Sequence, residues 1–305
     1  SAASDVYKRQ ILEIVDFLNA RARENQWGFV DFNRPMVAIN QWEQAEDSMY
    51  TLCGKDRIHP STDGHLVMAY LFLKAQGLAG KPVADIRIDG AGKKVTRSDN
   101  CRVSDLSVSS DNLTFTYEAK SLPYPIDTSY YDNEKHTQAD ALSVIPFMDE
   151  MNYEGLSVSG LSDGYYGLTI GGEFIGRFTA RELERGINMA LLQNTPQYKQ
   201  AMKIRQMNEE RWLKERKMRE FYWVEYNLMR KTGMLWACNE AAVDTLRKYR
   251  PHDIFLQWNG DLWLQYMHKG IREDCVNEQQ DLVNQIYEQN KPIPLRIEIK
   301  KFTDL

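Results

Sequence analysis

The sequence lacks several features that would each define its class at once. No run among its 305 residues is apolar over the roughly 20 positions that a membrane helix needs. Charges of the two signs nearly balance, with 38 Lys and Arg against 43 Asp and Glu, and the formal net charge is −5. Such a weak, evenly spread charge does not attract polyanions, so no nucleic-acid partner is expected. Low-complexity disorder is excluded because aromatic residues make up 11% of the chain.

Cysteine is scarce and scattered. The four cysteines are Cys53, Cys101, Cys238 and Cys275, and no Cys-x-x-Cys pair occurs. This spacing excludes a zinc ribbon and a thioredoxin-type motif. Isolated buried thiols are the simpler interpretation, and one or two long-range disulfides are the alternative if the protein is exported. We expect no metal and no cofactor.

The first ten residues do not look like part of a natural protein. Residues 5–10, Asp-Val-Tyr-Lys-Arg-Gln, read as the translation of DNA that resembles the transposon-end adapter of sequencing libraries. Residues 1–10 are therefore excluded from the fold prediction as an adapter artefact. We expect the natural protein to continue upstream of Ile11, so the absence of a signal peptide is uninformative.

Residues 11–80 have the pattern of a doubly wound α/β layer seen at its last unit. Residues 11–24 carry apolar side chains at helical spacing, which predicts an amphipathic helix packed on a core. The short apolar run 27–32 ends near Asp31 and predicts a parallel strand. After Pro60, Ser61 and Thr62, residues 63–74 are apolar nearly all round, as in a helix buried against a sheet.

Residues 81–194 change to a β pattern. Ile86 and Ile88, and later Leu113, Phe115 and Tyr117, alternate with polar residues, which predicts antiparallel strands with one wet face. Asp-Gly and Asp-Asn pairs supply turns. Gly171-Gly172, between two apolar segments, predicts a two-residue hairpin because both positions can take positive φ. We expect a β-rich accessory region.

Residues 195–305 form a helical region with a final strand. A long helix is predicted from Thr195-Pro196 to Thr232, before Gly233, with further helices near 239–249 and 277–289. The segment 294–299 alternates like a strand that returns to the β layer. The basic residues of the long helix are interleaved with glutamates at i, i+4 spacing, so its charges are expected to form a solvated face.

The strongest chemical signal is Asp56-Arg57-Ile58-His59-Pro60, which precedes the buried helix. An acid three positions before a histidine on a Pro-bounded loop can bend back and accept a hydrogen bond from imidazole Nδ1. That bond fixes the tautomer and leaves Nε2 free as a general base. By itself, Asp-x-x-His is common and also occurs in ordinary surface loops.

The wider context of this motif resembles the last catalytic block of the SGNH (GDSL-type) hydrolases. There, the Asp and His of an Asp-x-x-His-Pro segment, often followed by a Gly-His helix start such as Gly64-His65 here, complete a triad with a serine near the N-terminus. The resemblance implies a flavodoxin-like α/β/α domain, of which residues 11–80 are the C-terminal part, and catalytic roles for Asp56 and His59. The serine and the oxyanion-hole residues lie in earlier blocks of these enzymes, and those blocks are absent here.

A second stretch, Leu156 to Ala201, is similar to C-terminal regions of large bacterial SGNH esterases. The similarity rests on short motifs such as Gly160-Leu161, Gly186-Ile187-Asn188 and Thr195-Pro196. Many such esterases are secreted or periplasmic, so export is expected from the resemblance.

Several other motifs favour structural interpretations. Residues 160–164 spell Gly-x-Ser-x-Gly but lie between β segments, so a hairpin turn is expected instead of a nucleophile elbow. His65, near His59 and Cys53, lacks metal-ligand spacing and is expected to be structural.

An aromatic motif and a further histidine also allow more than one interpretation. Trp258-Asn259-Gly260-Asp261, with Trp263 and Tyr266, could form a sugar platform, but core packing is favoured. His136 is expected to be a solvated loop residue.

The leading hypothesis is a serine esterase of SGNH type, acting through an acyl-enzyme on an ester such as an acetylated carbohydrate, with its nucleophile outside this chain. Residues 11–305 alone are then expected to be inactive. The alternative is a non-catalytic module that binds carbohydrate or protein and retains a vestigial Asp-x-x-His loop. A third, weaker hypothesis is an oligomerisation role for the helical tail.

Overall fold

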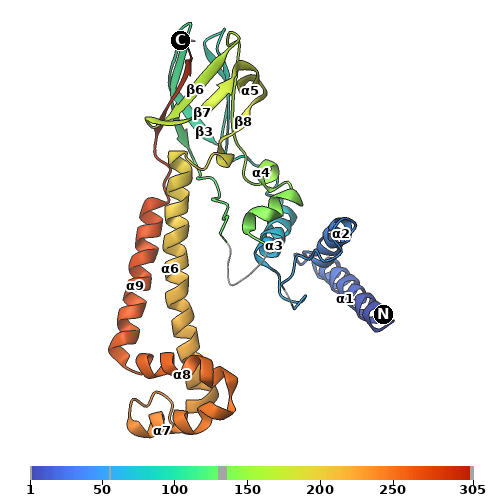
Figure 1. Ribbon diagram of the computed structural model, residues 1–305, viewed down its shortest axis with the longest axis vertical. Coiled ribbons are helices and arrows are strands. Elements are labelled where there is room, and N and C mark those ends of the chain that lie inside the picture. The colour runs from blue at the N-terminus through green and yellow to red at the C-terminus, as the bar shows by residue number, and fades with distance from the viewer. Residues whose placement is uncertain (1, 55, 130–135, 303–305) are drawn as a thin grey trace. The chain divides into compact units, whose positions relative to one another are not determined.

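The computed structural model describes residues 2–54, 56–129 and 136–302, and the chain divides into two compact units. Unit 1 consists of residues 1–198 and 292–305, and unit 2 of residues 199–291 (Figure 1). Within the described part of the chain, no helix has the length and apolar character to cross a membrane.

The β-rich part of unit 1 is a pair of β-sheets that share one hydrophobic core. The strands are β1 (Ala84–Asp89), β2 (Lys94–Asp99), β3 (Cys101–Val108), β4 (Asn112–Ala119), β5 (Glu154–Ser159), β6 (Tyr165–Ile170), β7 (Glu173–Thr179), β8 (Ile187–Asn188) and β9 (Leu295–Lys301). One sheet has the order β2-β1-β5-β8 and the other β3-β4-β9-β6-β7. The predicted final strand is confirmed, because β9 pairs with β4 and β6. The expectation of purely antiparallel pairing is wrong at one place, since β1 and β5 run parallel.

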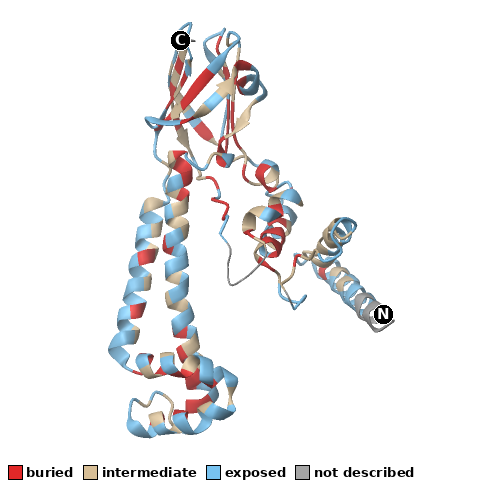
Figure 2. Cartoon of the chain, in the orientation of Figure 1, coloured by how far each residue is buried: buried red, intermediate tan, exposed pale blue. Residues whose placement is uncertain are grey.

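Alternating side chains fill the space between the sheets. In β4, Leu113, Phe115 and Tyr117 are buried, whereas the residues between them are half-buried. Ile297 and Ile299 of β9 are fully buried in the same core (Figure 2). The predicted hairpin is also confirmed: Gly171 and Gly172 join β6 to β7 with φ of 60° and 85°.

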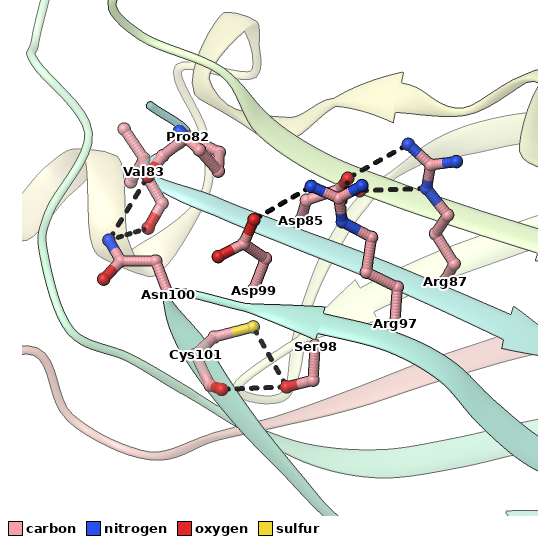
Figure 3. A network of polar contacts seen from close by, with 9 residues as sticks. All are labelled: Pro82, Val83, Asp85, Arg87, Arg97, Ser98, Asp99, Asn100 and Cys101. Carbon is pink, nitrogen blue, oxygen red and sulfur yellow. Dashed lines mark hydrogen bonds and ion pairs between the residues drawn. The ribbon is translucent and has the colours of Figure 1, made fainter. Parts of the chain in front are cut away.

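The chain passes from one sheet to the other through a polar corner between β2 and β3 (Figure 3). Asn100 takes φ 52° there, and its side-chain amide donates to the carbonyl of Val83 at 2.9 Å. On the neighbouring strands, Arg87 and Arg97 both pair with the buried Asp85, at 3.1 and 2.9 Å. These contacts satisfy polar groups at the place where the ladder is interrupted.

The N-terminal part of unit 1 is helical and contains no strand among its described residues. Its helices are α1 (Ala2–Asn25), α2 (Asn33–Glu43) and α3 (Thr62–Ala75). The helix predicted over 11–24 lies within α1, but Ile11 and Leu18 are exposed, so its packing on a core is not observed. The strand predicted over 27–32 is wrong: the segment is irregular and leads into the unpredicted α2. A parallel strand needs a neighbouring strand for its hydrogen bonds, and none pairs with it in the described chain.

Helix α3 is correctly predicted, but its packing partner is not a sheet. Leu66, Val67 and Tyr70 are buried against Leu52, Ile126 and the short helices η1 (Gln138–Ser143) and α4 (Phe147–Glu150). The flavodoxin-like α/β/α assignment of residues 11–80 is therefore not confirmed. The chain as a whole is mixed α and β, with the β-rich region and the helical region in the predicted order.

Short helices complete unit 1. They are α5 (Ala180–Arg185) and η2 (Met189–Leu191). A capping box begins α5: the Thr179 hydroxyl accepts from the Glu182 amide at 3.1 Å, and the Glu182 carboxylate accepts from the Thr179 amide at 2.7 Å.

Unit 2 is helical. It contains most of α6 (Pro196–Val224), a π-helical turn (Glu225–Met229), α7 (Glu240–Tyr249), η4 (Arg250–His252), α8 (Ile254–Tyr266) and α9 (Lys269–Gln289). Figure 1 shows α9 alongside α6, where Lys214 pairs with Glu278 at 2.7 Å. The predicted Glu210–Lys214 and Glu215–Arg219 pairs are formed, at 3.7 and 3.5 Å, so the charges of α6 do form a solvated face.

The core of unit 2 surrounds a buried carboxylate. Glu225 accepts from the Trp263 indole N–H and from the Trp236 backbone N–H, both at 2.8 Å. The π-helical turn begins at this residue, and such turns accommodate an extra residue inside a helix. Burial of Trp263 and Tyr266 confirms core packing for that part of the aromatic motif.

Candidate active site

The Asp56–His59 segment is a short loop that is closed at its base by backbone hydrogen bonds. Cys53 and Pro60 form an isolated β-bridge, and the Gly54 amide donates to the His59 carbonyl at 2.8 Å. The Ser61 amide donates to the Leu52 carbonyl at 3.0 Å. The two ends of the loop are therefore held together, one at Leu52 and the other at the start of α3.

Within this loop, the acid and the histidine make the predicted contact. His59 Nδ1–H donates to Asp56 Oδ2 at 2.6 Å. Asp56 Oδ1 accepts the backbone N–H groups of Ile58 and His59, at 2.9 and 3.1 Å. The His59 hydrogen bond, followed by these two backbone bonds, lowers the pKa of the Asp56 carboxyl to about 2. Asp56 is thus an anion whose hydrogen bond holds the His59 imidazole in the tautomer that carries its proton on Nδ1.

The other ring nitrogen is open. The His59 side chain is 83% exposed, and among the described residues no group hydrogen-bonds to Nε2. Arg57 takes φ 56° to make the tight turn between Asp56 and His59. The arrangement can accept a proton at Nε2 from a group brought to it, which is the general-base half of a catalytic triad.

A buried polar cluster lies directly beneath the loop. The hydroxyl of Ser61 lies between the Leu52 carbonyl and Asp63 Oδ1, and Asp63 Oδ1 also accepts the Gly64 amide at 2.8 Å. Ser61 and Asp63 are both buried. A Cβ on Gly64 would collide with the carbonyl oxygen of Leu52, so only glycine allows α3 to start this close to the loop.

His136 reaches this cluster from a distant part of the sequence. Its Nδ1 lies 3.6 Å from Asp63 Oδ2, and its ring meets Tyr50 edge to face at 5.9 Å between centroids. The expectation of a solvated loop residue is therefore wrong. The sequence contained no local signal for this contact, because His136 and Asp63 meet only through the tertiary fold.

The other candidate motifs do not form sites. Residues 160–164 connect β5 to β6, which belong to different sheets, so they form neither a nucleophile elbow nor the expected hairpin. Ser162 is exposed, and its hydroxyl accepts from Lys301 Nζ at 2.7 Å. His65 is exposed on α3, so a structural role for it is not supported. No group of three or more potential metal ligands occurs in the parts of the chain that are described.

All four cysteines are unpaired. Cys101 and Cys275 are buried, as the simpler interpretation predicted, whereas Cys238 is exposed and Cys53 is half-buried. Burial raises the pKa of the Cys53 thiol beside the loop, which disfavours the reactive thiolate. Cys53 is therefore a poor candidate for a nucleophile that His59 would activate.

Comparison with known proteins finds a family model that matches part of unit 2. Residues 202–291 match the model of the family described as the diltiazem deacetylase C-terminal helical domain. These residues make up nearly all of unit 2. The matched segment lies outside the Asp56–His59 loop and says nothing about which residues act there.

A solved structure extends this similarity over most of the chain. It is described as a gut microbial diltiazem-metabolizing enzyme and is 41% identical to this chain, with a TM-score of 0.89 over 96% of the chain. The match spans 66% of that enzyme's own chain. Comparison with curated proteins gives no match. Neither description names an SGNH hydrolase, so that assignment stays a prediction.

Proposed function

We propose that the whole protein is a serine esterase of SGNH type that hydrolyses acetyl esters, with Asp56 and His59 as two members of its triad. The observation that carries this proposal is the 2.6 Å Asp56–His59 hydrogen bond, with Nε2 of the same imidazole open. The similarity to a diltiazem-metabolizing enzyme and to a diltiazem deacetylase domain supports a hydrolytic deacetylase. Acetylated carbohydrates are the natural substrate class that we propose to test first.

In this mechanism, His59 Nε2 accepts the hydroxyl proton of a serine as its oxygen attacks the acetyl carbonyl. The proton then passes from His59 to the departing alcohol, and an acetyl-enzyme remains. In the second half, His59 takes a proton from water, the water oxygen attacks the acetyl-enzyme, and acetate leaves as the serine regains its proton. Asp56 keeps Nδ1 protonated throughout and stabilises the imidazolium that forms in each half.

The serine of this proposal lies outside the 305 residues. The described residues bring no hydroxyl or thiol to His59 Nε2, and the similar enzyme's chain is longer than the matched region. We therefore propose that residues 11–305 alone do not turn over an aryl acetate. Measurable turnover by this segment, abolished by His59→Ala, would show that the nucleophile lies within it.

The test is hydrolysis of p-nitrophenyl acetate and of acetylated xylan oligosaccharides by the complete reading frame. His59→Ala is expected to lower kcat/KM at least about 10³-fold, because removal of a triad member leaves only residual catalysis. Asp56→Asn is expected to lower kcat more than it raises KM, because it disturbs the tautomer and not substrate binding.

The matched control is His65→Ala. His65 is an exposed histidine six positions further along, on the first turns of α3. It should retain activity within about twofold. Equal activity of the His59→Ala and wild-type proteins would contradict the esterase proposal and favour the non-catalytic binding module.

A further inference from the structure

One side of unit 2 carries a row of aromatic rings, three of them exposed and one, Trp223, half-buried against the core. Trp212 and Trp223 come from α6, and Phe255 and Trp258 from α8; we refer to these four residues as the aromatic row. Trp258 is 67% exposed, and Trp212 and Phe255 are also exposed. The expectation of core packing for the Trp258–Tyr266 motif is therefore only partly correct: Trp263 is buried, but Trp258 faces solvent.

The rings support one another in fixed orientations. Trp223 and Phe255 are tilted by 38° with centroids 5.2 Å apart. Phe255 meets Trp258 edge to face, with centroids 5.4 Å apart. On the opposite side of α8, Leu256, Gly260 and Trp263 are buried and hold the helix in place. The exposed ring faces therefore form a preorganised surface, which reduces the entropy lost when a ligand binds.

Two hollows adjoin the row and share Trp223 as a wall. One has a volume of ≈ 410 Å³ and is lined by Trp212, Trp223 and Asn259, among others. The other has a volume of ≈ 430 Å³ and is lined by Trp223, Asn227 and Tyr249, among others. Volumes of roughly 300–1,000 Å³ are typical of small-ligand sites. Adjacent hollows of this size suit consecutive units of a chain-like ligand.

The polar groups around the first hollow are nearly neutral in sum. Arg216 donates to Glu220 at 2.7 Å, and Arg219 pairs with Glu215 at 3.5 Å while it lies over the Trp212 ring. The side-chain amide of Asn259 has no hydrogen-bond partner in the described chain and lines the hollow. Paired guanidiniums give little attraction for a polyanion or an anionic membrane, whereas a free amide suits a neutral hydroxyl.

From these features we infer that the aromatic row, with Asn259, is a binding site for a neutral carbohydrate chain. The C–H faces of sugar rings stack on the exposed rings of Trp212 and Trp258 and on the open part of the half-buried Trp223, and the Asn259 amide bonds ring hydroxyls. An exposed patch of rings rimmed by polar groups is the type of surface that marks a ligand-binding groove. The inference does not depend on the esterase proposal, because the site lies wholly within unit 2.

The experiment is a titration of the full 305-residue chain, followed by tryptophan fluorescence and calorimetry. The probes are cellohexaose, xylohexaose and mannohexaose, each neutral and soluble. Saturable binding of at least one of them is expected, weakened at least about tenfold by Trp258→Ala and by Asn259→Ala. Circular dichroism of each variant checks that the helices are retained.

The control is Trp236→Ala. Trp236 is also an exposed tryptophan of unit 2, but it belongs to a separate group of rings with Tyr222 and Tyr226. This variant should bind the probe like the wild type. The inference is overturned if none of the three sugars binds saturably up to about 10 mM, the weak end of specific affinity, or if Trp236→Ala and Trp258→Ala weaken binding equally.

Two further outcomes would assign the surface to another occupant and also overturn the inference. One is co-sedimentation with phosphatidylserine vesicles that Trp258→Ala abolishes, without sugar binding. The other is a dimer in light scattering that Trp258→Ala dissociates, again without sugar binding.

Discussion

The two-sheet core and the N-terminal helices of unit 1 differ in how far they bury their apolar side chains. In β4 and β9, apolar residues of one face are buried between the sheets, whereas α2 has no buried residue and its Trp42 is 80% exposed. In Figure 2, red segments recur along the strands, whereas the coloured parts of α1 and α2 are mostly tan and pale blue. Hydrophobic periodicity identifies the face of an element that can be buried. Whether that face is buried depends on a partner being present.

The Asp56–His59 loop shows that local order does not need a large core. Its geometry comes from short-range hydrogen bonds and from the close approach of Leu52 to Gly64. The Asp56–His59 pair can therefore be well defined although neighbouring helices expose apolar residues.

The largest expected difference between the two regions is in the unfolding free energy lost when an aromatic side chain is truncated. Phe115→Ala removes a fully buried ring between the sheets and is expected to lower the unfolding free energy by about 3–5 kcal/mol. Trp42→Ala removes a larger but exposed ring and should change it by less than about 0.5 kcal/mol. Amide hydrogen exchange in β4 and β9 measures the first effect without interference from unit 2. Similar losses for both variants would contradict the contrast.

The next prediction concerns a charge buried in the sheet region. Glu154 is fully buried and accepts from the Tyr117 hydroxyl at 2.8 Å and from the Gln197 amide at 3.2 Å. Burial raises its pKa from 4.5 to about 7, against the opposing effect of these hydrogen bonds. Between these two values the folded state binds the proton and the unfolded state does not. The contribution of Glu154 to stability is therefore fully present below pH 4.5 and is lost as pH rises to about 7, by about 3 kcal/mol in all.

Hydrogen exchange in β1 and β5 across this pH range measures the dependence, after correction for the intrinsic exchange rate. Glu154→Gln should remove most of it, because the amide cannot ionise. Glu184→Gln, an exposed glutamate of α5, is the matched control and should leave it unchanged. A dependence that survives Glu154→Gln would assign it to another group.

The smallest expected effect concerns the local stability of the Asp56–His59 loop. Gly64→Ala places a Cβ against the Leu52 carbonyl and should cost about 1–3 kcal/mol of local stability, as overpacking does. Gly28→Ala is the control, because a Cβ there has no atom within 4 Å. Hydrogen exchange of the Ser61 and Gly54 amides reports loop opening. Faster exchange in Gly64→Ala alone is expected, and equal exchange in both variants would show that the contact is relaxed without cost.

Much of the β-rich region could be predicted because its signals are local. Alternation defined β4, the Gly171-Gly172 pair defined a hairpin, and the segment 294–299 was correctly predicted to return to the sheets. The parallel pairing of β1 with β5 could not be predicted, since strand direction depends on which strands meet in space. The strand prediction over 27–32 was wrong because it also depended on a neighbouring strand, and none pairs with this segment in the described chain.

The site divides in a similar way. Asp56 and His59 are three residues apart, so their contact follows from the loop alone. His136, in contrast, approaches Asp63 only because η1 packs on α3. Trp258 and Trp263 lie in one motif, and only the packing of α8 decides that one is exposed and the other buried.

The sequence by itself determined the acid–histidine pair, the alternating strands, the hairpin and the amphipathic helices of this protein, because each depends on residues close together in the chain. Only the tertiary structure decided the sheet order, the partner of α3, the contact of His136 with Asp63 and the exposure of the aromatic row. Those features depend on which surfaces meet, and the free energy of burial belongs to the pair of surfaces and not to either sequence segment.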